Sequence, residues 1–236
     1  MPMTPLAEIR TVPATIYNYG PDAFPVLRES SPQHPLTRKG AIRVELERRL
    51  LVASERGARA LVLRAGDFFG PRAGNNWFSQ GLVKPGRPLT RVSLPGAPGV
   101  GHQWSYLPDV GRILVELLAR REALAPFAAF HMAGHWDPDG RRMAEAIVRV
   151  ARRHGAGPRV GAFPWGLLRL AAPFSETLRE LLEMRYLWRQ PLRMDNARLV
   201  DVLGSEPQTP LDVAVEATLR GLGCLPQTAP ATAAAA

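Results

Sequence analysis

The chain has 236 residues, of which 46% are hydrophobic and 22% are charged, and its formal net charge is +9 at pH 7. This length and apolar fraction suffice for one large domain, or for a domain with a small additional lobe, around a packed core. A single cysteine, Cys224, excludes a disulfide framework and favours a reducing, cytoplasmic location. Residues 1–10 include Glu8 and lack a sustained apolar run, so no signal peptide is expected.

The positive charge is compatible with polyanion binding, but its distribution argues against a specific nucleic-acid partner. Basic residues alternate with acidic ones, as in residues 43–49 (RVELERR). Zinc-finger, RNP and basic-tail patterns do not occur. We therefore expect a solvated surface that is rich in arginine. No apolar run approaches the roughly 20 residues of a spanning helix, so no membrane partner is expected.

The first part of the chain predicts a strand, a helix and a second strand. Residues 11–17 contain β-branched and aromatic residues and predict a strand, whereas four prolines make residues 20–35 a loop. Residues 40–56 predict a helix that ends at Gly57, followed by an apolar β-run at residues 60–63. The apolar face of that helix is expected to consist of Ile42, Leu46, Leu50 and Ala53. This succession is typical of a βαβ unit.

The remaining elements are short and mostly helical. They are a short helix to residue 83, strands at 90–94, 127–132 and 159–163, and helices at 109–118, 139–154, 174–188, 194–203 and 209–222. Asp109 is expected to cap the helix that it begins. We expect an α/β fold in which a partial Rossmann-like parallel sheet carries a small, mostly helical C-terminal substrate lobe. The expected regions are a Rossmann-like remnant (1–71), a mixed lobe with returning Rossmann elements (72–225) and a disordered tail (226–236).

Three segments carry the residues that connect this sequence to a known family. Residues 15–20 (TIYNYG) end the first strand, residues 64–71 (RAGDFFGP) end the second, and residues 102–110 (HQWSYLPDV) precede a helix. In this order they resemble the SSxxVYG-like, RPxNVYGP-like and RDFxxVDDVA-like segments of extended short-chain dehydrogenases/reductases, the NAD-dependent epimerase/dehydratase family, in an atypical form. Ala65, Asp67 and Phe69 depart from the second segment.

The family's glycine-rich loop does not follow a first strand in this sequence. The chain thus resembles the family without its N-terminal cofactor-binding half. The resemblance therefore predicts a truncated protein that is inactive alone.

The acid/base residues of the family are the part of its pattern that this sequence matches least. There, a Ser or Thr, a Tyr and a Lys act together, and the Tyr transfers a proton at the substrate oxygen. Thr15 stands at the hydroxyl position, but no Tyr-x-x-x-Lys occurs. Matching Glu47 places Lys39 at the Tyr position and Arg43 at the Lys position. Matching Lys39 to the Lys instead places Pro35 at the Tyr position, and both alignments remain open.

The resemblance also implies which residues meet the ligands. The catalytic candidates are Thr15, Tyr19, Lys39 and Arg43. The expected cofactor is NAD or NADP, with contacts from Lys39, Arg43, Arg64, Gly66 and Phe69. The expected substrate contacts are Asp67, Asn75, Asn76, Trp77, His102, Trp104 and Tyr106. Gly66 permits a close backbone approach, and Asp67 offers acceptors only. His102 stands where sugar-nucleotide members place an Arg, which argues against a nucleotide-sugar substrate.

The predicted function is that of an NAD(P)-dependent epimerase, dehydratase or reductase-like protein that acts on a small carbonyl or sugar-type substrate. The alternative is a non-catalytic interaction module of the same fold, which pairs with a second copy or a partner chain through an exposed sheet edge at residues 11–17. A basic nucleic-acid-binding protein is a third and less favoured hypothesis. His131 and His135 are separated by Gly134 at the end of a strand, and no metal site is expected there.

Overall fold

A computed structural model describes residues 9–74 and 76–225, so the expected tail lies outside the described residues. Strand β1 (Ile9–Thr15), helix α1 (Arg38–Glu55) and strand β3 (Arg59–Ala65) form the first unit of the chain. β1 and β3 are parallel, and β7 (Phe127–His131) adds a third parallel strand on the other side of β3. The order β1-β3-β7 confirms the expected α/β fold with a partial Rossmann-like parallel sheet.

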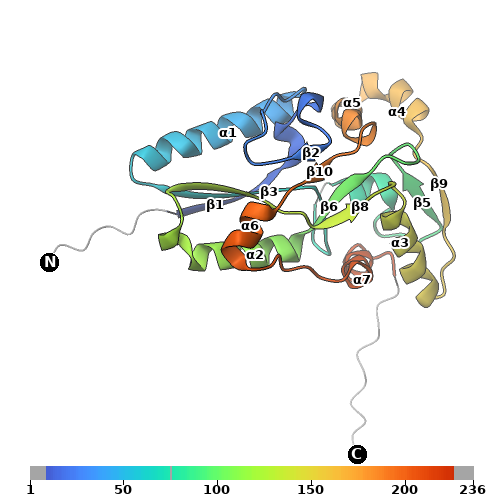
Figure 1. Cartoon of the computed structure of the whole chain (residues 1–236). Coiled ribbons are helices and arrows are strands. Elements are labelled where there is room, and N and C mark those ends of the chain that lie inside the picture. Colours follow the sequence, from blue (N-terminus) through green and yellow to red (C-terminus); the bar gives the residue numbers. More distant parts are fainter. Residues whose placement is uncertain (1–8, 75, 226–236) are drawn as a thin grey trace, which may run out of the picture.

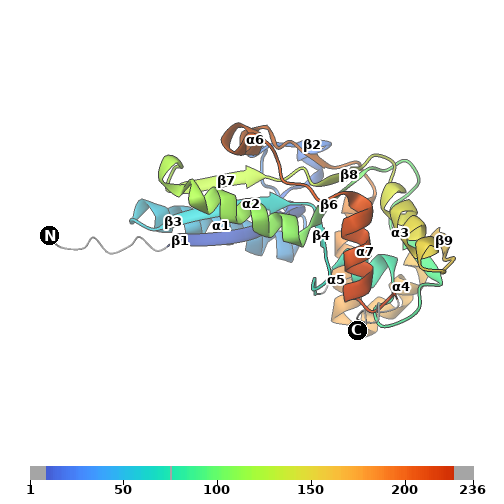
Figure 2. The ribbon, with the colours of Figure 1, turned by 90° about the horizontal axis from the view of Figure 1, so that it is seen from below.

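Helices cover both faces of this sheet. α1 lies on one face, and α2 (Leu107–Ala119) lies on the other (Figures 1 and 2). Leu61 and Leu63 of β3 belong to the same buried cluster as Ile113 and Leu117 of α2. A parallel strand that is buried on both faces consists of a continuous apolar run, and this is why the sequence identified β3 so readily.

α1 is buried along a different face from the one expected. Its N-cap residue Thr37 accepts a hydrogen bond from the Gly40 amide at 3.1 Å. The buried positions of the helix are Gly40, Glu47 and Ser54, whereas Ile42 is 57% exposed. The expected apolar stripe is therefore wrong at Ile42, although Leu50 packs against the sheet, because a buried partner for Glu47 decides which side of α1 faces inward.

Three smaller sheets join segments that are distant in sequence. They are β4 (Asp67–Phe69) with β6 (His102–Tyr106) and β8 (His135–Asp137), β5 (Arg91–Leu94) with β9 (Arg159–Ala162), and β2 (Val26–Leu27) with β10 (Arg193–Met194). β8 is antiparallel to β6, and the other pairs are parallel. β2 lies in the proline-rich segment that was expected to be a loop without regular structure.

Short helices dominate the C-terminal lobe. They are α3 (Arg142–Arg153), α4 (Trp165–Ala171), α5 (Glu176–Glu183), α6 (Ala197–Leu203) and α7 (Leu211–Gly221). Short 3-10 helices cover Ile16–Asn18, Pro21–Ala23, Arg121–Ala123, Ala172–Phe174 and Met184–Trp188, and a π-helical turn covers Phe78–Leu82. The region boundary at residue 71 stays a prediction. Over the described part of the chain, no helix has both the length and the apolar character to cross a membrane.

Several helix boundaries differ from those expected: α3, α6 and α7 begin two or three residues later, and Met194 belongs to β10. The helix expected over residues 174–188 is divided after Glu183 into α5 and the 3-10 segment. α2 begins at Leu107, so Asp109 lies within its first turn. The Asp109 carboxylate accepts hydrogen bonds from the backbone N and the Oγ1 of Thr209, both at 2.7 Å. Asp109 thus attaches α2 to the segment before α7 instead of capping its own helix.

Gly66 joins β3 to β4 and lies against the backbone of β6. A Cβ atom at Gly66 would lie 2.3 Å from the carbonyl oxygen of Gln103. Because the neighbour is main chain, it cannot rotate out of the way. The close approach that Gly66 permits is therefore that of a neighbouring strand.

We expect Gly66→Ala to lower the free energy of unfolding by about 3 kcal/mol, because the added methyl group overlaps a backbone carbonyl. Gly111→Ala is the matched control, since Gly111 lies inside α2 with no atom near its hypothetical Cβ. That control should raise the free energy of unfolding by up to about 1 kcal/mol through helix propensity. Urea denaturation of both variants measures the two effects, and equal effects would contradict this account.

Candidate functional site

The carboxyl ends of β1, β3 and β7 meet at one edge of the main sheet, where the segments that follow them come together. Tyr17 and Tyr19 follow β1, Asp67 follows β3, and His131 ends β7. In open α/β sheets, ligands bind outside this edge. The polar side chains here form two networks, one closed to solvent and one that borders a pocket.

The closed network is built on an ion pair. Arg64 donates from Nη2 to the Oε2 atom of Glu47 at 2.6 Å, and its Nε lies 3.1 and 3.2 Å from the two carboxylate oxygens. Both side chains are almost fully buried. A second Glu47 contact comes from the Nδ2 of Asn18 at 2.8 Å. The predicted cofactor residue Arg64 thus has its donors engaged by protein groups.

An oriented chain of hydrogen bonds extends this network to β7. Arg64 Nη1 donates to the Tyr19 hydroxyl at 2.7 Å, and that hydroxyl lies 2.7 Å from His131 Nε2. His131 Nδ1 faces the carbonyl oxygen of Leu27 at 3.3 Å, so Nε2 accepts from Tyr19. Burial, and then the positive charge of Arg64, lower the pKa of His131 to about 3. Burial raises the pKa of Tyr19, so this catalytic candidate keeps its proton inside the fold.

The second network links Tyr17, Asp67 and His102. The Tyr17 hydroxyl donates to Asp67 Oδ1 at 2.9 Å, and His102 Nε2 lies 2.8 Å from Asp67 Oδ2. The His102 ring stacks on Trp188 with a centroid distance of 3.7 Å. His102 Nδ1 has no hydrogen-bond partner among the described residues, so the hydrogen shared with Asp67 lies on Nε2. Two expected substrate contacts, Asp67 and His102, therefore bind each other.

Tyr17 is not among the site residues expected from the sequence. Its spacing from Lys39 does not match the family motif, yet the folded chain brings the two side chains to one pocket. Burial, followed by the charge and the hydrogen bond of Asp67, raises the pKa of Tyr17 well above 10. At neutral pH the phenol thus stays protonated, and its proton is directed at Asp67.

The inner pocket has a volume of about 140 Å³. It is lined by Tyr17, Lys39, Asn76, Trp77, Gln80, Glu180, Leu181 and Met184. Lys39 Nζ pairs with Glu180 Oε2 at 2.7 Å, so α1 and α5 meet across this pocket. Arg43 lies half-buried one turn further along α1, and its positive charge acts on the Tyr17 phenol. The two cations proposed to replace the family's Tyr and Lys thus lie beside Tyr17.

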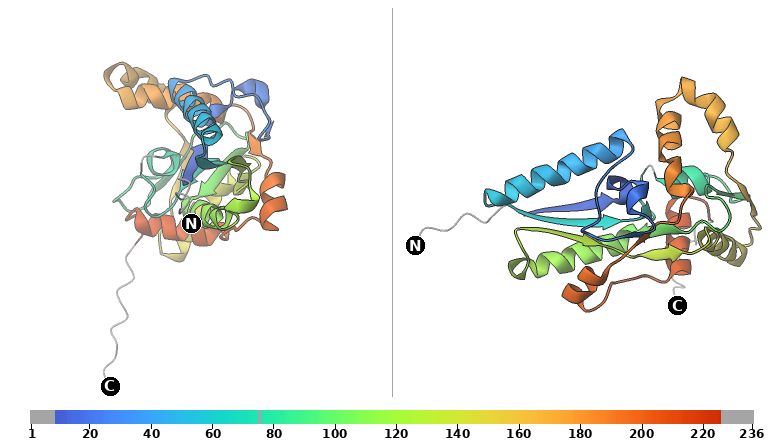
Figure 3. Two further views of the ribbon diagram at one scale, coloured as in Figure 1. Left: turned by 90° about the vertical axis from the view of Figure 1, so that its left-hand side faces the viewer. Right: turned by 45° about the horizontal axis from the view of Figure 1, so that its top comes forward.

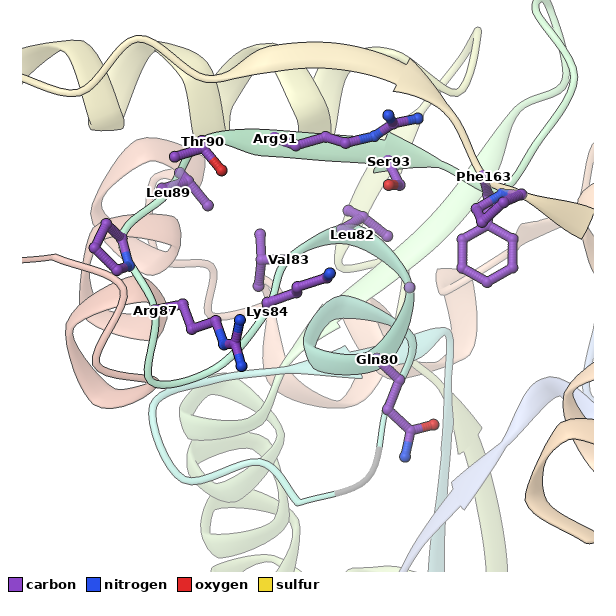
Figure 4. Close-up of a pocket in the computed structure, with 13 residues that line it drawn as sticks. Gln80, Leu82, Val83, Lys84, Arg87, Leu89, Thr90, Arg91, Ser93 and Phe163 are labelled. Atoms are coloured by element: carbon purple, nitrogen blue, oxygen red, sulfur yellow. The ribbon is translucent and has the colours of Figure 1, made fainter. Parts of the chain in front are cut away.

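The outer pocket is larger, with a volume of about 440 Å³ (Figure 4). Its lining comes from the π-helical turn, the loop that follows it, β5 and the two residues after β9. Three cations contribute, Lys84, Arg87 and Arg91, and no carboxylate is among the thirteen lining residues. Gln80 lines both pockets, so they adjoin there. Sequence reasoning missed this pocket, although its cations are visible in residues 84–91 (KPGRPLTR).

The other expected site residues serve mainly as structural contacts. Thr15 accepts from the Tyr17 amide at 3.3 Å, and Asn76 accepts from the Ser79 amide at 2.9 Å. Trp77 contacts the ring of Trp188, with centroids 5.2 Å apart. Phe69, Trp104 and Tyr106 are fully or almost fully buried and pack against one another. Asn75 lies outside the described residues. No three metal-ligating side chains gather in the described ranges.

The described residues do not complete a cradle for NAD or NADP. Of the five expected contacts, Arg64 is bound by Glu47, Gly66 is covered by Gln103, and Phe69 is fully buried. Of the remaining two, Lys39 lines the inner pocket, and Arg43 lies one turn further along α1. A dinucleotide also needs backbone amides of a glycine-rich turn at a helix N-terminus. Such a turn is not found next to β1 within the described residues.

The arrangement defines the class of fold. A parallel sheet with helices on both faces, followed by a lobe of short strands and helices, is the architecture of the NAD-dependent epimerase and short-chain dehydrogenase/reductase structures, to which the chain is similar over more than nine tenths of its length. The family resemblance seen in the sequence is confirmed at the level of the fold. No family model and no curated protein matches the sequence itself.

Individual solved structures make this similarity specific. RMD from Pseudomonas aeruginosa, complexed with NADPH, has a TM-score of 0.62 and 18% identity over 93% of this chain. MoeE5 in complex with UDP-glucose and NAD has a TM-score of 0.62 and 18% identity over 91% of this chain. A UDP-galactose 4-epimerase has a TM-score of 0.61 and 14% identity over 91%. The chain spans 68%, 64% and 63% of these three proteins, respectively.

The buried His131 predicts a loss of stability in acid. In the unfolded chain His131 binds a proton below about pH 6.5, whereas in the folded chain it stays neutral down to about pH 3. The free energy of unfolding therefore falls as the pH drops through this range. Between pH 7 and pH 4.5 the loss from this group is about 2.5 kcal/mol. Urea denaturation should show that the free energy of unfolding of His131→Gln falls by about 2.5 kcal/mol less than that of the unchanged chain over this pH range. Parallel curves for the two proteins would contradict the assignment.

Proposed function

We propose that the chain is an NAD(P)-dependent epimerase- or reductase-like protein, and that its adjoining pockets bind a sugar-type substrate with an anionic group. The observation that carries the proposal is the pairing of a polar inner pocket with an outer pocket that has three cations and no acidic lining residue. We further propose that these 236 residues do not turn over substrate by themselves. Lys39 and Arg43 are the proposed contacts to the cofactor.

The sizes of the pockets support a proposed place for each end of the substrate. The outer pocket lies within the range of about 300–1,000 Å³ that is typical of ligand sites, whereas the inner pocket is smaller. The bulky, charged part of the substrate therefore belongs in the outer pocket. Only a small group, such as a hydroxyl-bearing carbon of a sugar ring, reaches the inner pocket past Gln80.

The inner pocket offers two different contacts to such a group. Tyr17 directs its hydrogen at Asp67, so its oxygen presents lone pairs and favours a hydroxyl donor. Lys39 presents an ammonium group, which favours an oxygen acceptor. Asp67 and His102 act as positioning residues, because they hold the Tyr17 hydroxyl without reaching the pocket themselves. These residues bind and orient the substrate.

The nature of the anionic group follows from the outer pocket and from the similar structures. The sequence argued against nucleotide sugars, because His102 stands where the similar family places an Arg, and in the fold His102 is buried against Asp67. Lys84 and Arg87 make no ion pair within residues 9–74 and 76–225, and they provide the positive charge that a diphosphate requires. MoeE5, which has the same fold, is complexed with UDP-glucose and NAD. We therefore propose a nucleoside diphosphate sugar.

Binding of UDP-glucose, measured by isothermal titration calorimetry, tests this assignment. We expect Lys84→Glu and Arg87→Glu each to weaken binding by about tenfold or more, since a cation is replaced by a like charge. Arg49→Glu is the matched control, because it makes the same charge change on the exposed side of α1. Equal weakening in all three variants would mean that net charge, and not the outer pocket, determines the affinity. No binding by the unchanged chain would overturn the proposal.

Catalysis is a separate prediction. The unchanged chain, mixed with UDP-glucose and either NAD or NADPH, should show neither a change in nicotinamide absorbance nor a new sugar product by chromatography. The reason is that it has no Tyr-x-x-x-Lys and that its cofactor contacts are incomplete. Turnover at an enzyme-like rate would disprove the proposed inactivity while leaving substrate binding intact.

The free edge of β1 supports a second candidate function, that of an interaction module. Over the described ranges, β1 pairs only with β3, so its other edge is unpaired by any strand. A second copy or a partner chain would add a strand there. Pro13 lies in the middle of β1 and removes one donor from the ladder, which limits the length of such an addition. A defined oligomer in light scattering favours this candidate, and a monomer argues against self-pairing.

A further inference from the structure

A helical hairpin in the C-terminal lobe exposes large apolar side chains. It consists of residues 165–183, in which α4 and the following 3-10 turn fold back on α5, and it stands out from the rest of the molecule (Figure 3). Leu167, Leu170 and Phe174 are 68%, 75% and 90% exposed. Leu167 and Leu170 share one side of α4, because they are three residues apart. Contiguous exposed apolar groups of this size are uncommon on a protein surface and indicate a contact site.

Positive charge borders this apolar surface. Arg169 belongs to α4, and Arg185 and Arg189 lie just beyond α5. The Arg185 guanidinium lies over the ring of Trp165, at 4.9 Å. Partial desolvation, and then the positive charges of Arg189 and Arg169, lower the pKa of Arg185. This direction is expected where three guanidinium groups lie near one another. None of the three forms an ion pair within the described part of the chain.

The acidic residues of α5 do not cancel this charge. Residues 165–189 contain four arginines and three glutamates. One of the glutamates, Glu180, is neutralised by Lys39 at the inner pocket. The remaining two, Glu176 and Glu183, begin and end α5. The hairpin together with residues 184–189 is therefore apolar at its turn and carries one more arginine than glutamate.

The dimensions of the patch favour a lipid surface over a second copy of the chain. Three side chains of this size expose on the order of 400 Å², about half of the roughly 800 Å² that each partner contributes to a standard interface. A bilayer interface has no such minimum area, because each inserted apolar side chain contributes independently. Anionic headgroups also complement free guanidiniums, at about 1 kcal/mol for each cation near the surface.

We propose that this hairpin docks the protein on the surface of a bilayer that contains anionic phospholipids. Leu167, Leu170 and Phe174 enter the interface, while Arg169, Arg185 and Arg189 contact lipid phosphates. A contact of this kind needs no spanning helix, and it is weak, reversible and sensitive to salt. It is independent of the proposed substrate and of the inactivity proposed above.

Co-sedimentation of the whole chain with vesicles tests the proposal. We expect binding to vesicles of phosphatidylcholine mixed with phosphatidylglycerol, little binding to phosphatidylcholine alone, and release at high salt. The double variant Leu170→Asp/Phe174→Asp and the single variant Arg169→Glu should each lower the partition coefficient about tenfold or more. All three side chains are exposed, so the variants should keep the thermal unfolding midpoint of the unchanged chain.

Val115→Asp is the matched control, because Val115 is an equally exposed apolar residue on α2, far from the hairpin in the fold. It should leave partitioning unchanged. The proposal is overturned if the unchanged chain does not sediment with anionic vesicles, or if Val115→Asp reduces sedimentation as strongly as the hairpin variants. A dimer in solution that Phe174→Asp converts to monomer would also overturn it, because a second copy would then cover the patch.

Discussion

Arg64 and Glu47 lie side by side in the interior, where either charge alone would be strongly destabilising. Arg64 ends the central strand and Glu47 lies midway along α1, so their pairing sets the rotation of α1 on the sheet. Lys39 lies about two turns before Glu47, and this rotation of α1 brings it to the inner pocket beside Tyr17. The same guanidinium orients Tyr19 and, through it, His131 at the end of β7. One buried pair thus aligns three strands, a helix and a pocket.

Much of the fold can be predicted from the sequence, because many elements are determined by residues that are neighbours in the chain. The apolar run of β3, the proline-rich start of the segment after β1 and the capped beginning of α1 all arise from neighbouring residues. The short strands are different. Val26 and Leu27 have no β-pattern of their own and become a strand only because Arg193 and Met194 arrive beside them. The orientation of α1 was mispredicted for the same reason, since the buried partner of Glu47 is seventeen positions away.

The candidate site shows a similar limit. Asp67 and His102 were predicted to contact the substrate, but the sequence could not reveal that they bind each other and hold Tyr17. The outer pocket was missed because Lys84, Arg87 and Arg91 lie in a turn-rich segment, and nothing local shows that β9 brings Phe163 across from them. Residue types can thus be proposed from the chain, whereas their partners are set by strand pairings between distant segments.

The small ladder between β2 and β10 has a consequence for the order in which the molecule assembles. It joins a segment before α1 to one after α5, so the chain must close a very long loop before these four residues can pair. The β1-α1-β3 unit makes its contacts over a much shorter distance in sequence and is suited to form first. The lobe that completes both pockets is then the last part to dock, and ligand binding reports the end of folding rather than its beginning.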